Sequence, residues 1–103
     1  MKATIAKIVN YIVQTTDPQS VLLFGSVADG TSNVHSEIDL LIVVERSEVK
    51  EFVEEKTQSY IRDLGMNSDI LVHLETEVEQ ASLQPESFLG SVVKNAKILY
   101  KKR

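Results

Sequence analysis

The order of apolar patterns along the chain limits its possible folds more than any other feature. Segments with helical spacing alternate with continuous apolar runs, and turn residues separate them. The first helical stripe consists of Ile5, Ile8, Val9, Ile12 and Val13. Its i, i+3, i+4, i+7 and i+8 spacing predicts a helix over about residues 4–14. Such an amphipathic helix needs an apolar surface to cover.

Shorter apolar runs predict the strands that supply this surface. Residues 21–24 and 69–74 are apolar runs bounded by turn or polar residues, which is typical of buried strands. Residues 38–44 form the strongest run and should lie at the centre of the sheet. Residues 98–100 favour a final strand at the sheet edge.

Further helices are predicted between and after these strands. Ser47 is the expected N-cap of a helix that continues to Leu64 and stops at Gly65. Thr76 and Glu79 have the spacing of a capping box, and Pro85 is expected to open the last helix. This alternation of helices and strands predicts a layered α/β fold. A length of 103 residues fits one domain, 1–103.

Composition narrows the classes of function. Hydrophobic residues make up 43% of the chain and charged residues 25%, as in ordinary globular domains. There is no membrane-length apolar run, no secretory signal pattern and no cysteine, so we expect a cytoplasmic protein without disulfides. The net charge of −4 repels phosphate backbones, so autonomous nucleic-acid binding is not expected. A triphosphate ligand would need its charge neutralised by a metal or a basic partner.

A glycine and a serine follow the first strand directly. Gly25 lets the backbone turn sharply and approach a ligand, and Ser26 adds a hydroxyl donor. If a short helix begins after Ser26, its free N–H groups would face an anion. Taken alone, a Gly-Ser pair after a strand is more often only a turn, and the same holds for Gly30.

Three carboxylates stand at the starts of two predicted strands. Alternate residues of a strand share a face, so Glu37 and Asp39 should project together. Asp69 opens the next strand and joins them if the two strands are neighbours. Clustered carboxylates repel each other, and a hard cation such as Mg²⁺ would remove that cost. The alternative is that all three residues merely cap strand starts.

At this point the residues resemble a known family. Ten residues separate Gly25-Ser26 from Glu37-Ile38-Asp39, which is similar to the signature of the minimal nucleotidyltransferases of the DNA polymerase beta superfamily. The resemblance covers nearly the whole chain, including the Asp69-led strand and the closing Leu99-Tyr100. It implies a nucleotidyltransferase fold, a small mixed β-sheet flanked by helices.

The resemblance also implies a reaction and its residues. Glu37, Asp39 and Asp69 would be catalytic and would hold two Mg²⁺ ions, with ATP as the substrate. The nucleotide would be bound by Gly25, Ser26, Gly30 and Ser36, with the first two at the β- and γ-phosphates. A hydroxyl, aided by Asp69, would attack the α-phosphate and take up AMP. Small members resemble antitoxins paired with a HEPN-type protein, which some of them adenylylate.

Two departures from the family pattern leave an alternative function possible. Glu37 stands where the family usually has Asp, and the turn carries Val27, Ala28 and Asp29 where many relatives have Arg. The rival is a catalytically weak or inactive member that acts as a binding-only antitoxin. A plain structural α/β domain is the third possibility. A homo- or hetero-oligomer is also plausible for so small a domain.

Overall fold

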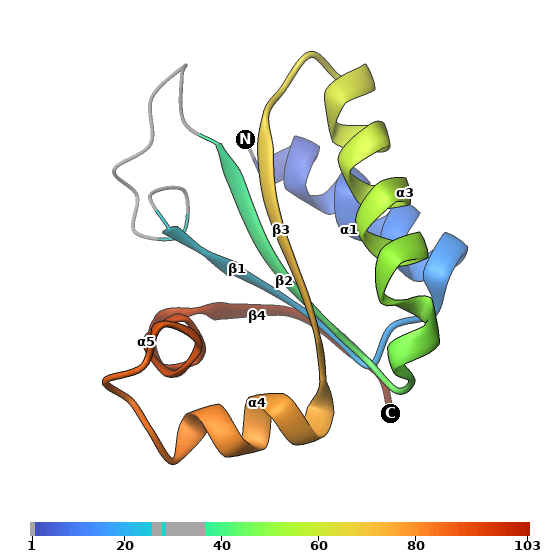
Figure 1. The fold of residues 1–103 in the computed structure, drawn as a ribbon. Helices are drawn as coiled ribbons and strands as arrows, with labels where there is room; N and C mark the ends of the chain where they lie inside the picture. Colours follow the sequence, from blue (N-terminus) through green and yellow to red (C-terminus); the bar gives the residue numbers. More distant parts are fainter. Residues whose placement is uncertain (1, 26–27, 29–36) are drawn as a thin grey trace.

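The computed structural model describes residues 2–25, 28 and 37–103. The elements in chain order are α1 (Lys2–Thr16), β1 (Ser20–Phe24), β2 (Ile38–Val44), the 3₁₀-helix η1 (Ser47–Val49), α3 (Lys50–Asp63), β3 (Ser68–Leu74), α4 (Glu75–Ser82), α5 (Phe88–Asn95) and β4 (Lys97–Lys101). The strands form one sheet in the order β3-β2-β1-β4 (Figure 1). The expected helices and strands are thus confirmed, with β2 inside the sheet and β4 at its edge.

The sheet is mixed. β1 runs antiparallel to both β2 and β4, whereas β2 and β3 are parallel. Parallel neighbours need a long crossover, and α3 lies in that connection. The four-stranded mixed sheet with flanking helices confirms the predicted fold class.

Alternation along the strands divides the apolar residues between two faces. One face of β2 carries Ile38, Leu40, Ile42 and Val44, all buried. These residues share the larger core with the buried stripe of α1 and with α3, which cover this face (Figure 1). The broad apolar stripe predicted for residues 4–14 therefore has its surface to cover.

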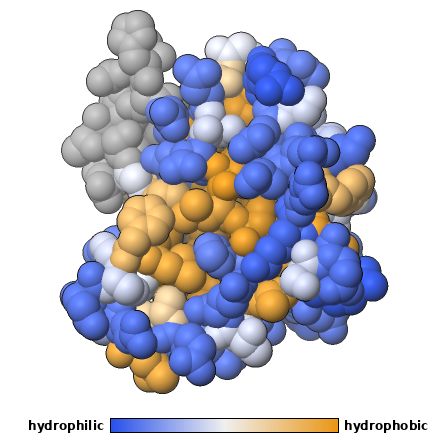
Figure 2. All heavy atoms as spheres, viewed as in Figure 1, coloured by the Kyte–Doolittle hydropathy of each residue, from blue (hydrophilic) through white to orange (hydrophobic). Residues whose placement is uncertain are grey.

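The opposite face carries a smaller core. Leu41 and Val43 of β2 pack there with Leu22 and with Val92 of α5. Phe24 and Leu71 join this cluster but are only partly buried. Apolar surface remains visible over the sheet next to α4 and α5 (Figure 2). This incompletely covered face is the one on which Asp39 lies, since Asp39 alternates with the buried Ile38 and Leu40.

Three predicted helix starts are wrong. Ser47 lies inside η1 and gives no cap, because the chain enters α3 through this 3₁₀ turn. α4 begins at Glu75, two residues before the start that Thr76 would cap, and Glu77 accepts the Leu74 N–H at 2.7 Å. Pro85 precedes α5, whose N-cap is Ser87, with its hydroxyl accepting the Gly90 N–H at 3.0 Å.

In the described ranges, the structure contains no helix with both the length and the apolar character needed to cross a membrane.

Candidate functional site

Gly25 places the end of β1 directly against a carboxylate. Phe24, the last residue of β1, pairs with Asp39 of β2. Gly25 follows with a φ of +76°, a conformation that side-chain-bearing residues rarely adopt. A Cβ at this position would overlap Oδ2 of Asp39 and would lie 2.9 Å from its Cγ. Only glycine therefore lets the turn and the Asp39 carboxylate occupy this arrangement.

Asp39 and Asp69 are brought together by the parallel pairing of their strands. The register places Asp39 opposite Asp69, so both side chains project from the same face. Burial, followed by the negative charges of Asp69 and Glu37, raises the pKa of Asp39 to about 6. The folded protein thus holds Asp39 where ionisation is costly.

Glu37 occupies a different position from the two aspartates. It precedes β2, is exposed, and borders a hollow of about 280 Å³ together with Arg62 and Asn67. Its charge still acts on Asp39. Across residues 2–25, 28 and 37–103, no group of three or more histidine or acidic side chains has the geometry to hold one ion. The structure therefore places Asp39 and Asp69 side by side. Glu37 lies near them, but the three side chains do not form a preformed metal site.

The rest of the predicted nucleotide-binding turn is not part of this geometry. Ser26, Gly30 and Ser36 lie outside the described residues. Their assignment to the nucleotide stays a prediction, as do the catalytic and metal-binding roles of Glu37, Asp39 and Asp69.

Arg62 and Asn67 are candidate site residues that sequence reasoning missed. They reach the hollow beside Glu37 from the last turn of α3 and from the connection to β3. The available signal was positional, because any helix that crosses over between β2 and β3 ends near the start of β3, where Asp69 lies.

A second group of polar side chains lies further along the same sheet face. His73 follows Asp69 by four residues, and its Nδ1 lies 3.4 Å from Oε1 of Glu77. Lys50 donates to the same Glu77 oxygen at 2.7 Å. The hydrogen bond from the Leu74 N–H, followed by Lys50, lowers the pKa of Glu77 to about 2. These contacts tie β3, α3 and α4 together and direct His73 towards Glu77.

The chemistry of the two aspartates fits a hard divalent cation. Both offer oxygen ligands, which Mg²⁺ prefers. A cation between them would offset the repulsion and burial that raise the pKa of Asp39. The half-buried Phe24 and Leu71 provide apolar surface on the same face.

Comparison with known proteins agrees with the fold that the sequence resemblance implied. The family model described as "Polymerase beta, Nucleotidyltransferase" matches residues 6–103. A candidate nucleotidyltransferase from Sulfolobus solfataricus is 26% identical, with a TM-score of 0.59 over 93% of this chain and 76% of that one. A toxin–antitoxin structure with AMP-PNP is 18% identical, with a TM-score of 0.58 over 94% and 73%, and shares the fold. No curated protein matches. The chain belongs to the polymerase beta nucleotidyltransferase family.

Proposed function

We propose that this protein transfers AMP from Mg²⁺-bound ATP to a hydroxyl group of a partner protein, and that it acts as an antitoxin. The observation that carries the proposal is the convergence of the Gly25 turn, Asp39 and Asp69 on one sheet face. Gly25 leaves space for the Asp39 carboxylate, and the Asp69 carboxylate lies beside it in the sheet. This arrangement suits the binding of a cation together with its phosphate ligand.

Each residue has a distinct task in this reaction. Asp39 and Asp69 would hold Mg²⁺, which when bound would neutralise phosphate charge and acidify the acceptor hydroxyl. Asp69, the more exposed of the two, accepts the hydroxyl proton. The hydroxyl oxygen then forms a bond to the α-phosphorus while the bond to the β-phosphate oxygen breaks, and pyrophosphate leaves. Phe24 and Leu71 offer apolar surface for the nucleoside.

The nature of both substrates is supported by less direct observations. The toxin–antitoxin structure that shares this fold was determined with AMP-PNP, an ATP analogue. The net charge of −4 disfavours a polynucleotide acceptor, because an acidic protein repels a phosphate backbone. A protein acceptor, of the HEPN type that family resemblance implies, is compatible with this charge.

A binding-only antitoxin is the second candidate, and the position of Glu37 favours it. Glutamate reaches about 1.5 Å further than aspartate, roughly one C–C bond. In this structure Glu37 is exposed beside the hollow with Arg62 and does not complete a metal-holding group among the described side chains. A partner would then be masked by contact without being modified. If the long side chain is the handicap, Glu37→Asp should raise transfer activity.

Incubation with labelled ATP, Mg²⁺ and the protein encoded by the adjacent gene tests the proposal. Intact-mass analysis should show the partner gaining one AMP with the wild-type protein. Asp69→Asn should abolish the gain, whereas Asp63→Asn, the same change at an exposed end of α3, should preserve it. A partner that is inhibited but unmodified would establish the binding-only function and overturn the transferase.

A further inference from the structure

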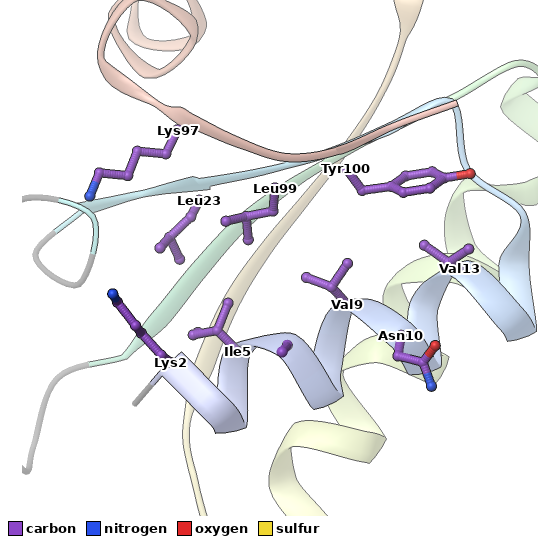
Figure 3. Close-up of a pocket in the computed structure, with 10 residues that line it drawn as sticks. Lys2, Ile5, Val9, Asn10, Val13, Leu23, Lys97, Leu99 and Tyr100 are labelled. Carbon is purple, nitrogen blue, oxygen red and sulfur yellow. The ribbon is translucent and has the colours of Figure 1, made fainter. Parts of the chain in front are cut away.

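A large apolar groove lies on the sheet face opposite to Asp39 and Asp69. It has a volume of about 730 Å³ and runs between α1 and the edge strand β4 (Figure 3). Leu23 of β1 lines it, on the other side of the strand from Phe24. The groove is therefore separated from Asp39 and Asp69 by the thickness of the sheet, and its Lys97 pairs with Leu23, two residues before Gly25.

One wall of the groove is a second stripe of α1. The core stripe of this helix is Ile5, Ile8 and Ile12, all buried. A neighbouring stripe of Lys2, Ala6, Val9 and Val13 lines the groove together with Ile5. These positions span three helical turns, or about 16 Å. Ala6 lies in the middle of this stripe and is exposed. Because its side chain is a single methyl group, a ligand in the groove can approach the helix backbone closely at this point.

The other wall is the edge of the sheet. β4 pairs with β1 on one side only and ends the strand order. Its Leu99 and Tyr100 face the groove and are partly buried. Among the described elements, α1 and α3 cover this face of a four-stranded sheet. The described residues that line the groove come from α1, β1 and β4, so no second helix covers this side of α1.

The charges at the groove ends are asymmetric. Lys2 of α1 and Lys97 of β4 stand at the same end of the groove, on its two opposite walls (Figure 3). The Tyr100 ring and Asn10 lie towards the other end (Figure 3). An apolar occupant with carboxylates at one terminus would match this pattern in a single orientation.

A second copy of this chain that docked through its own α1 or β4 would bring no carboxylate to Lys2 and Lys97. α1 contains no acidic residue, and neither does β4. A dimer formed through either element would place lysine-bearing surfaces against each other, and like charges in contact are destabilising. A different protein with acidic residues suits the lysines better.

We propose that this groove binds an amphipathic helix of a partner protein. The helix presents apolar residues at i, i+3, i+4 and i+7 to Val9, Leu99 and Tyr100. Acidic residues at one end of the helix meet Lys2 and Lys97. Docking here needs no nucleotide transfer, because the groove and the carboxylates are on opposite faces of the sheet.

Fluorescence anisotropy with a designed helical peptide tests the docking surface. The probe is a fluorescein-labelled peptide of roughly 15 residues, long enough to span the groove, with leucines at i, i+3, i+4 and i+7 and two glutamates at one end. We expect the wild-type protein to bind it. Ala6→Gln, which fills the groove from an exposed position, and Lys2→Glu with Lys97→Glu should each weaken binding about tenfold or more.

Matched controls separate docking from unfolding and from unspecific charge effects. Lys7→Glu, on an exposed part of α1 that does not line the groove, should leave affinity unchanged. A peptide with lysines in place of its glutamates should regain affinity for the Lys2→Glu/Lys97→Glu variant. Circular dichroism melting checks that each variant folds.

Three results would overturn the proposal. The first is no binding of the peptide to the folded wild-type protein. The second is an equal loss of affinity in Lys7→Glu. The third is sedimentation that shows a dimer of the wild-type chain which Ala6→Gln dissociates, because the groove would then belong to a second copy. None of these results depends on ATP, so the proposed transferase activity stands or falls separately.

Discussion

Gly25 and Asp39 determine each other's conformation across the β1–β2 pair. The glycine has a positive φ, and its missing side chain leaves the space into which Oδ2 of Asp39 projects. Gly65 also has a positive φ, of +81°, but nothing lies within 4 Å of its Cβ position. The two glycines therefore separate the effect of backbone conformation from that of crowding at the site.

Gly25→Ala should be more damaging than Gly65→Ala. Both variants force a left-handed conformation on alanine, which costs about 1–2 kcal/mol. Only Gly25→Ala also displaces Asp39, so we expect a larger loss of stability in urea denaturation together with loss of ATP binding. Gly65→Ala should keep ATP binding. Equal destabilisation by the two changes, with nucleotide binding intact in both, would contradict the contact between Gly25 and Asp39.

Asp39→Asn should stabilise the protein above neutral pH. Since the pKa of Asp39 is about 6 in the folded protein and 3.8 ordinarily, its favourable contribution is complete below about pH 4 and is lost as pH rises through 6. Asparagine has the same shape but no charge to ionise. We expect a gain of roughly 1 kcal/mol at pH 8, reduced by solvent screening, and none at pH 4.

Chemical denaturation without metal at the two pH values measures this difference. A constant difference between wild type and Asp39→Asn at both pH values would show that Asp39 does not ionise against its surroundings.

Sequence reasoning predicted the positions of Asp39 and Asp69 on the sheet better than the position of Glu37. The period of two predicted the faces of Asp39 and Asp69, and strand order then brought them into register. Glu37 follows the same count, yet it precedes β2, where no ladder holds the side chain to one face. Arg62 and Asn67 join the hollow only through the path of the chain after α3, which no local pattern encodes.

At the scale of elements, the sequence predicted which segments form helices and strands but not how helices begin. Apolar periodicity reports burial over many residues, so α1, β2 and β3 were found within a few residues of their ends. A helix start depends on one or two hydrogen bonds. Thr76 and Glu79 have capping-box spacing, but the bend after β3 assigns the capping role to Glu77 instead.

Glu77→Gln should destabilise the junction of β3 and α4. The carboxylate of Glu77 accepts hydrogen bonds from the Leu74 N–H and the Lys50 ammonium group. These bonds lower the pKa of Glu77 from 4.5 to about 2. This contribution is present above pH 4.5 and is lost as pH falls towards 2. Because the side chain is 39% exposed, we expect a loss of about 1 kcal/mol at pH 7 and a smaller one at pH 3.

Glu79→Gln is the matched control for this junction. Glu79 is exposed on the same helix, and its replacement should be close to neutral. Urea denaturation at pH 7 and pH 3 measures the free energy of unfolding of both variants. Comparable losses for Glu77→Gln and Glu79→Gln would show that general helix charge, rather than the Leu74 and Lys50 contacts, supports α4.

At the scale of the whole molecule, the sheet separates two surfaces of different chemistry. The face of α4 and α5 carries Asp39 and Asp69, whereas the face of α1 carries the apolar groove with Lys2 and Lys97 at its end. Alternation along β1 enforces this separation, because Leu23 and Phe24 must point to opposite sides. We therefore expect substitutions at the two aspartates and substitutions in the groove to affect the two proposed functions separately.

Isothermal titration calorimetry with ATP, in the presence and absence of Mg²⁺, measures whether the two aspartates hold a metal-bound nucleotide. We expect the wild-type protein and Asp63→Asn to bind ATP only when Mg²⁺ is present, and Asp39→Asn to show no binding under either condition. ATP affinity that is the same in wild type and Asp39→Asn, or that persists when EDTA removes the metal, would contradict the site.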